Sequence, residues 1–405
     1  MTALGDHAEH LNLVRFRNDG DDFHVLWTAR RAVRMIAPKS RLRAVAVEGI
    51  SVNDRLKGKR IGAGLLVADT VEYYGSENFG TAERVVVNQL KYSTQNVDTP
   101  WPWSGLSDTI IGFAARFAAS AKEYGIRHTI AAGRYRFVTN RPISANVLEA
   151  IDAVIRGGTD SLKGSAKRVC QELQTKLGLK DLRLRQFLGT LELRGNQVSR
   201  HDQQTSLAAE VGRIQPGAPD SSVARLKELI RTLGTSSATD DPVLRIETVL
   251  RTFDVEDPAH LLPAPAHFET VGQAVERDQD AALLDAIRQA PGPFLVTAPG
   301  GVGKSITTQR IASLMPAGSE VVTFDGFAGG GYRARSEARH RHDVGLVQIA
   351  NELATRGLCD VLLPSAAPPH VLLRSFRSRL TQAAAIVRAR SSDALVVIVL
   401  DAADN

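Results

Sequence analysis

The sequence predicts a chain of several α/β domains, and three observations support this fold class. Residues 293–314 pass from a short apolar run through a glycine-rich loop into a helical pattern, and a second apolar run at 395–400 ends in an acidic residue. The first 145 residues alternate between extended and helical patterns, as α/β domains do. We expect an N-terminal α/β domain at 12–145, a helical connector at 146–260 and a domain with a parallel sheet at 261–405.

Composition favours a globular cytoplasmic protein. Hydrophobic residues make up 43% and charged residues 23% of the 405 residues, which is ordinary for a globular chain. No apolar run approaches the roughly 18 residues of a membrane helix, and the N-terminus lacks the apolar core of a signal peptide. The two cysteines, Cys170 and Cys359, lie far apart and fit a reducing compartment. The net charge of +6 permits nucleic-acid binding without requiring it.

The N-terminal domain begins with a helical pattern that follows a frayed terminus at residues 1–12. Apolar residues at helical spacing predict a helix over 23–37, with Asp21 or Asp22 as its cap. The following elements are expected to be strands at 43–48, 65–74 and 84–93, a hairpin turn at 75–80 between the last two, a helix at 106–124 and a strand at 135–139. This order of helix, three strands, helix and strand is that of the restriction-endonuclease core.

Three polar side chains on the second and third predicted strands indicate metal-dependent chemistry. Alternate residues of a strand share a face, so Gln89 and Lys91 point the same way and Asp69 can face them from the neighbouring strand. Phosphodiester hydrolysis uses a divalent ion and a cation near the attacking hydroxide, so we predict all three residues as catalytic and Asp69 as a metal ligand. Gln89 replaces the acid of the (D/E)-x-K motif, and either Glu48 or Glu72 is a candidate for the missing carboxylate. The alternative is a solvated face of the sheet.

Two tryptophans and a basic region have less specific interpretations. Trp101 and Trp103 are of a type that stacks on bases, but packing of their loop against the sheet is the favoured interpretation. Lys and Arg outnumber Asp and Glu between residues 160 and 200, within a mostly helical region. A solvated helix face explains this excess of positive charge better than binding to a nucleic-acid phosphate backbone does.

A phosphate-binding loop follows residues 293–297, which we expect to form a buried strand. Its glycines allow successive backbone N–H groups to converge on phosphate oxygens, and the helix after it directs its positive end at the same place. Lys304 is expected to reach the phosphates and Ser305 to bind Mg²⁺. Ala298 replaces the first glycine of the G-x-x-x-x-G-K-[ST] motif, a mild departure. The predicted nucleotide contacts are Gly300, Gly301, Val302, Gly303, Lys304, Ser305 and Ile306.

A second acidic site is predicted where the apolar run 395–400 ends. The run is typical of a strand buried on both faces; Asp401 after it is expected to hold Mg²⁺, and Asp404 to orient the attacking water as a catalytic residue. The intervening elements are expected to be a helix at 278–290, a strand at 320–324 and helices at 344–356 and 372–390. The sequence stops at Asn405, directly after the acid, so we expect an incomplete P-loop domain.

These motifs together resemble a family, the bacterial antiviral STAND NTPases of the AVAST type with an N-terminal restriction-like nuclease. The nuclease part is similar to the endonuclease domain of cyclic-oligonucleotide defence systems. The N-terminal resemblance rests on VADTVEYYG (67–75), VVNQLKYST (86–94) and WPWSGL (101–106). The C-terminal resemblance rests on LLPAPAHFET (261–270), APGGVGKS (298–305), the run at 324–360 and VVIVLDAADN (396–405).

The resemblance implies an ATP-gated switch with ATP and Mg²⁺ as cofactors. In the family a phage component is recognised through a C-terminal region, which these residues lack; the protein then assembles as a homo-oligomer, and its nuclease acts on double-stranded DNA. Asn405 replaces a commonly acidic residue after Asp404. One alternative is a nucleotide-dependent scaffold whose N-terminal domain binds nucleic acid without cutting it, because Gln89 in place of an acid has removed a metal ligand. Another alternative is a plain ATPase unrelated to signalling. No partnership with a membrane is expected.

Overall fold

The computed structural model describes residues 3–54, 68–217, 219–235, 241–268, 278–290, 292–333, 338–364 and 367–402. Its contacts divide the mixed α/β chain into two compact units. Unit 1 comprises Met1–Ile36, Ser40–Glu210 and Asp220–Val249, and unit 2 comprises Ala37–Lys39, Val211–Pro219 and Leu250–Asn405. No helix in the described ranges is both long enough and apolar enough to cross a membrane.

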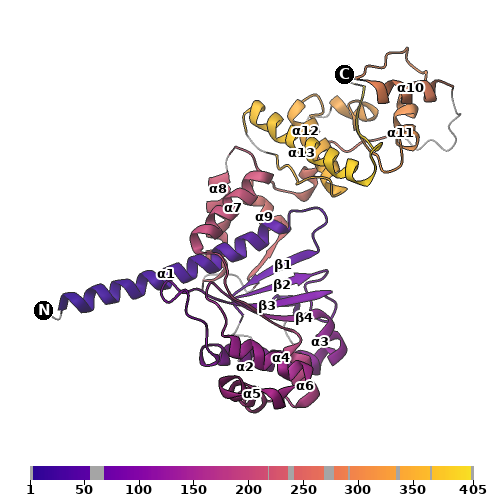
Figure 1. Cartoon of the computed structure of the whole chain (residues 1–405). Helices are drawn as coiled ribbons and strands as arrows, with labels where there is room; N and C mark the ends of the chain where they lie inside the picture. The colour runs from indigo at the N-terminus through magenta and orange to yellow at the C-terminus, as the bar shows by residue number, and fades with distance from the viewer. Residues whose placement is uncertain are drawn as a thin grey trace. The chain divides into compact units, whose positions relative to one another are not determined.

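The N-terminal elements of unit 1 follow the predicted order of helix, three strands, helix and strand, with one short unpredicted helix before the last strand (Figure 1). Helix α1 begins at Ala3, so Asp21 and Asp22 lie inside it and cap nothing, and the expectation of a frayed terminus is not met in the described residues. Strand β2 begins at Thr70, and residues 65–67 of the strand expected at 65–74 lie outside the described residues. The elements are α1 (Ala3–Arg34), β1 (Leu42–Val47), β2 (Thr70–Tyr74), β3 (Arg84–Lys91), α2 (Trp103–Tyr124), α3 (Ile126–Ala132) and β4 (Gly133–Thr139).

Six strands form the sheet of unit 1, in the order β5-β4-β3-β2-β1-β6. The β2–β3 hairpin is confirmed, since these strands pair antiparallel, whereas β3, β4 and β5 run parallel. Segment 146–260 is mainly helical as expected, but it also contributes two edge strands, β5 (Leu191–Arg194) and β6 (Val243–Arg245). Its longer helices are α4 (Ala145–Arg156), α5 (Gly164–Lys176), α6 (Asp181–Leu188), α7 (Arg200–Ile214), α8 (Pro219–Leu233) and α9 (Ile246–Arg251).

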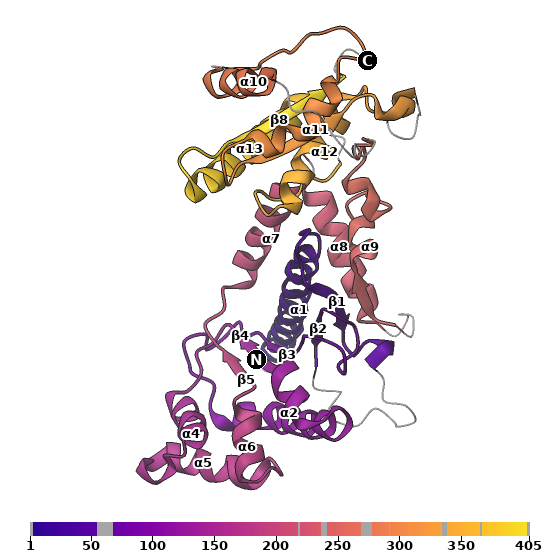
Figure 2. The same ribbon diagram turned by 90° about the vertical axis from the view of Figure 1, so that its right-hand side faces the viewer.

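Helices cover both faces of this sheet (Figure 2). On one face, α2, α4, α5 and α6 enclose a large apolar core with Val85 and Val87 of β3. On the other face, Phe23 and Trp27 of α1 pack against Leu90. Because successive residues of β3 point to opposite faces, the strand contributes to both cores, and α1 is fixed over one end of the sheet.

The two tryptophans of the loop before α2 have packing roles, as favoured from the sequence. Trp103 is buried in the large core and donates its indole N–H to Glu172 at 2.8 Å. Trp101 is half-buried, meets the ring of Phe137 edge-on and donates to Thr139 Oγ1 at 2.9 Å. Both indole N–H groups are thus satisfied inside the fold.

Unit 2 contains a pair of parallel strands and a helical core. Strands β7 (Glu320–Asp325) and β8 (Val396–Asp401) pair in register from Glu320 with Val396 to Asp325 with Asp401. The core lies between these strands and two helices, α12 (His342–Thr355) and α13 (Pro369–Arg390). Two further helices, α10 (Asp278–Gln289) and α11 (Lys304–Leu314), precede β7. The expected alternation of helices and parallel strands is confirmed for these elements.

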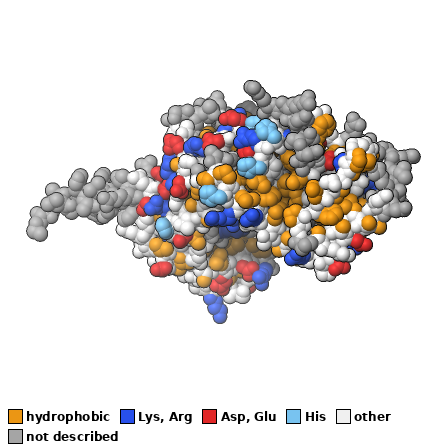
Figure 3. Space-filling view, turned by 90° about the horizontal axis from the view of Figure 1, so that it is seen from above, with side chains coloured by type: hydrophobic (Ala, Val, Ile, Leu, Met, Phe, Trp, Pro, Cys, Tyr) orange, Lys and Arg blue, Asp and Glu red, His pale blue; other side chains and the backbone are white. Residues whose placement is uncertain are grey.

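Two predictions about buried strands in unit 2 are wrong. Residues 293–297 form no strand, and Leu295 among them is 80% exposed. Strand β8 is only partly buried, and its Leu400 is exposed. The physical reason is shared: within the described residues β8 pairs only with β7, and 293–297 pairs with no strand, so neither segment is enclosed in a sheet interior. Figure 3 shows hydrophobic side chains (orange) exposed at the surface among charged ones.

Candidate active site

Asp69 and Gln89 are in direct contact, as the strand pattern predicts. Thr70 pairs with Asn88 across β2 and β3, so the residues just beyond them, Asp69 and Gln89, are neighbours. The Gln89 amide donates from Nε2 to both carboxylate oxygens of Asp69, at 2.9 and 2.8 Å, and the backbone N–H of Leu90 donates to Oδ2 at 2.6 Å. The side chain of Asp69 is 14% exposed. Three hydrogen bonds therefore fix the carboxylate at one end of the sheet.

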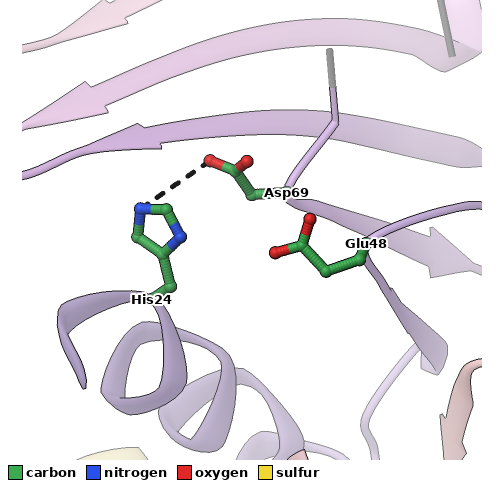
Figure 4. Close-up of side chains that lie close together, drawn as sticks. All are labelled: His24, Glu48 and Asp69. Carbon is green, nitrogen blue, oxygen red and sulfur yellow. Dashed lines mark ion pairs between the residues drawn. The ribbon is translucent and has the colours of Figure 1, made fainter. Parts of the chain in front are cut away.

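Of the two candidates for the missing carboxylate, only Glu48 lies at this site. Val47 pairs with Thr70 between β1 and β2, and the backbone N–H of Glu48 donates to the carbonyl of Asp69 at 2.8 Å. Glu48 and Asp69 offer carboxylate oxygens within 4.8 Å of one another, together with a nitrogen of His24 (Figure 4). The backbone of Glu48 has a φ of 51°, an uncommon left-handed conformation at the strand end.

Glu72 lies away from this site and has a structural role. It is inside β2, three positions beyond Asp69. Its buried carboxylate accepts from Asn88 at 3.0 Å and from the hydroxyl of Tyr74 at 2.6 Å. The guanidinium groups of Arg31 and Arg136 lie 3.4 and 3.5 Å away. These partners occupy the carboxylate, which is 1% exposed, and exclude it from the site.

Sequence reasoning missed His24. Its Nε2 lies 2.9 Å from the carbonyl oxygen of Leu90 and 3.9 Å from Asp69 Oδ2. The residue belongs to α1, which packs over this end of the sheet through Phe23 and Trp27. The only local signal for His24 as a site residue was its place one helical turn after Asp21, another ionisable residue. That spacing does not indicate that α1 lies near β2. Tertiary packing alone brings His24 to Asp69.

The electrostatics of the site favour a bound cation. Burial raises the pKa of Asp69 above its usual value, although electrostatic interactions with His24 and Lys91 and the hydrogen bonds to the carboxylate act in the opposite direction. Although Glu48 is an exposed residue, partial desolvation of its carboxyl and the negative charges of Asp69 and Asp21 raise its pKa to about 7. A divalent cation would stabilise the ionised form of both carboxylates and so offset the effects of burial and of neighbouring negative charge.

Lys91, the third predicted catalytic residue, ends β3 on the same face as Gln89. The residue is exposed, and its positive charge acts on the carboxyl groups of both Glu48 and Asp69, lowering the pKa of each. The structure thus groups Asp69, Gln89 and Lys91, as predicted, and adds Glu48 and His24 to them. Five side chains of the kinds used in metal-assisted hydrolysis lie at one end of the sheet.

The predicted nucleotide loop has the backbone shape that its glycines allow. Gly301 and Gly303 have φ of 79° and 86°, and a Cβ added at Gly300 or Gly301 would meet nothing within 4 Å. A helix follows the loop as predicted, but it begins at Lys304, directly after Gly303, and not at Ile306. Lys304 donates from Nζ to the carbonyls of Ala298 at 2.7 Å and Pro299 at 3.0 Å. Its charge is directed into its own loop.

The other predicted nucleotide and metal residues are distributed over unit 2. Ser305 is exposed in the first turn of α11, next to Ile306, and Val302 is exposed in the loop. Asp401 is the last residue of β8 and is partly exposed. Helix α11 and strand β8 are in contact, but no hydrogen bond joins Ser305 to Asp401 among the described residues, so their shared Mg²⁺ site stays a prediction. Asp404 lies outside the described residues, as does Asn405.

Asp325, which the sequence did not single out, has a structural role beside Asp401. The two residues are register partners at the ends of β7 and β8. The buried carboxylate of Asp325 accepts backbone N–H groups from Phe327, Ala328 and His267 at 3.1, 2.8 and 3.0 Å. Asp325 therefore stabilises the turn that follows β7.

Comparison with known proteins gives no family for this chain. No protein-family model matches it, and no curated protein matches it. Function is therefore inferred from the side chains and their geometry.

Proposed function

We propose that the chain is an ATP-gated antiphage defence protein with an N-terminal, metal-dependent nuclease that degrades double-stranded DNA. In this proposal unit 1 has a restriction-endonuclease-like core, and unit 2 is a STAND-type P-loop NTPase module that assembles when a phage component triggers it. The observation that carries the nuclease is the grouping of Asp69, Glu48, Gln89 and Lys91 at one end of a mixed sheet.

Each residue of unit 1 has a distinct role in this proposal. Asp69 and Glu48 are the carboxylates that would hold a divalent ion such as Mg²⁺, and the raised pKa values of both fit that task. When bound, such an ion polarises the scissile phosphate and makes a water molecule more acidic. Gln89 orients Asp69 through its amide, and Lys91 places a positive charge near the developing negative charge.

In unit 2 the loop around Lys304 is proposed to bind the phosphates of ATP. The open space at Gly300 and Gly301 allows phosphate oxygens to approach the backbone, and the N-terminus of α11 adds favourable electrostatics. The Nζ of Lys304 must leave the carbonyls of Ala298 and Pro299 to reach a phosphate. ATP binding thus replaces two neutral acceptors by a charged one, which strengthens the contact.

The proposed nuclease is tested with the 405-residue chain at high concentration, with plasmid DNA, ATP and either Mg²⁺ or Mn²⁺. We expect metal-dependent cleavage that is lost in Asp69→Ala and Lys91→Ala. Glu149→Ala serves as the control, because Glu149 is an exposed carboxylate of α4 in the same unit. Cleavage that persisted in Asp69→Ala would contradict the proposed site.

One observation favours a second candidate, a scaffold that binds nucleic acid without cutting it. The group that Gln89 presents to Asp69 is its amide nitrogen, a hydrogen-bond donor and not a metal ligand. A rotation of the amide by half a turn would present its oxygen to Asp69 in place of its nitrogen. A bound cation favours the oxygen, whereas without a cation the carboxylate favours the N–H donor. Absence of Mg²⁺ and Mn²⁺ binding to the chain, together with retained DNA binding, would support this scaffold and contradict the nuclease.

A further inference from the structure

We propose that His24 is a third ligand of the metal at the Glu48–Asp69 site, through Nδ1, and that the site therefore prefers a first-row transition ion such as Mn²⁺ over Mg²⁺. The inference deepens the proposed nuclease function and concerns the same site. It rests on the position of His24, the tautomer that its hydrogen bond requires and the chemistry of the donor set.

The position of His24 is set by packing and not by its own bonds to the carboxylates. Phe23, the preceding residue of α1, is fully buried against Leu90, and Trp27 lies one turn further on in the same cluster. Thr28 donates its hydroxyl to the backbone carbonyl of His24 at 2.8 Å. The imidazole is therefore held on a rigid element beside two carboxylates that come from the sheet (Figure 4).

The hydrogen bond to Leu90 determines which ring nitrogen is available. A carbonyl oxygen only accepts, so the Nε2 of His24, 2.9 Å from the oxygen of Leu90, must carry a proton. In the neutral ring Nδ1 then has a free lone pair. Histidines that bind metals commonly donate their other ring N–H to a backbone carbonyl or carboxylate, which fixes the ring and its tautomer. His24 has this arrangement.

The donor set indicates the class of metal. A ring nitrogen of His24 and one carboxylate oxygen each of Glu48 and Asp69 lie within 4.8 Å of one another. Mg²⁺ strongly prefers an all-oxygen environment, whereas Mn²⁺ and later ions of the row accept imidazole nitrogen beside carboxylate oxygen. Loss of the nitrogen ligand should therefore weaken Mn²⁺ binding more than Mg²⁺ binding.

The test uses Mn²⁺ bound to the 405-residue chain, with pulsed electron paramagnetic resonance to detect nitrogen coupled to the ion. We expect a nitrogen coupling in the wild type that disappears in His24→Gln. The ratio of Mn²⁺ affinity to Mg²⁺ affinity should fall about tenfold in this variant. Glutamine is chosen because its amide N–H reaches Leu90 as Nε2 does, so the contact with the sheet is kept. A folded His24→Gln variant is verified by its thermal unfolding.

His128→Gln is the matched control. The Nε2 of His128 also bonds to a backbone carbonyl, that of Phe79 at 2.6 Å, in the same unit but outside the metal site. Its replacement should leave both the nitrogen coupling and the metal preference unchanged.

The outcomes separate this inference from the proposed nuclease. Mn²⁺ that binds through Asp69 without nitrogen coupling, or with a coupling retained in His24→Gln, overturns the role of His24 and leaves the nuclease proposal intact. Absence of Mn²⁺ binding to the wild type also overturns the inference. A nitrogen-coupled Mn²⁺ ion in a chain whose DNA cleavage is unaffected by Asp69→Ala supports the metal site and contradicts the nuclease.

Discussion

Gln89→Glu is the substitution that best tests the geometry of the metal site. It restores the acid of the (D/E)-x-K motif, but the structure predicts a loss of stability when no metal is present. The amide of Gln89, 7% exposed, donates to both oxygens of Asp69 at 2.9 and 2.8 Å. A glutamate removes this donor and places a second carboxylate against the first.

The magnitude follows from these two effects. A hydrogen bond to a charged group contributes about 1.5–3 kcal/mol, and the repulsion between the carboxylates adds to its loss, so we expect about 2–4 kcal/mol lower free energy of unfolding at pH 8 in chelator. The new carboxyl group has a raised pKa when folded. The folded state therefore favours its protonated form, and the destabilisation is small near pH 4 and grows as the pH rises toward 8.

Tryptophan fluorescence during chemical denaturation reports the unfolding of unit 1, which contains the site. The chain has three tryptophans, Trp27, Trp101 and Trp103, and all belong to unit 1. Addition of Mn²⁺ should restore most of the lost stability, because the cation neutralises the paired carboxylates. Gln171→Glu, at an exposed position of α5, is the control and should change stability little. An equal loss with and without Mn²⁺, or no loss at pH 8, would refute the reasoning.

Three further predictions follow from the site and the core of unit 2. Lys304→Ala should weaken ATP binding about 10- to 100-fold by calorimetry, because one charged contact is lost, without changing Mn²⁺ binding to unit 1; unchanged ATP affinity would contradict the loop's role. Glu48 must lose its proton to bind metal, and with a pKa of about 7 we expect Mn²⁺ affinity to be about tenfold weaker at pH 6 than at pH 8. Glu48→Gln should reduce this pH dependence of Mn²⁺ affinity, whereas Glu72→Gln should lower the stability of unit 1 and leave the pH dependence unchanged. A pH dependence that is lost in Glu72→Gln and kept in Glu48→Gln would contradict the role of Glu48 as the metal ligand. Asn351 joins Leu261 and Leu362 through three hydrogen bonds, of which the two with Leu362 are buried. Asn351→Ala should therefore cost about 2–3 kcal/mol, measured by calorimetric unfolding, and a cost near zero would exclude this role.

The sequence alone determined the features that depend on local pattern. The order of elements from α1 to β4 follows from hydrophobic periodicity, and the contact between Asp69 and Gln89 follows from the alternation of strand residues across a hairpin. The presence of a helix directly after the glycine-rich loop is likewise a local matter of backbone conformation, although it begins at Lys304 and not at Ile306.

Only the tertiary structure decided which other groups join these residues. Glu48 reaches Asp69 because β1 pairs with β2 in one particular register, and His24 reaches them because α1 packs across the sheet through Phe23 and Trp27. The burial expected for residues 293–297 fails for the same reason, since a strand is enclosed only when other strands pair with it. Local sequence sets the conformation that a segment prefers, whereas register, packing and burial depend on partners far away in the chain.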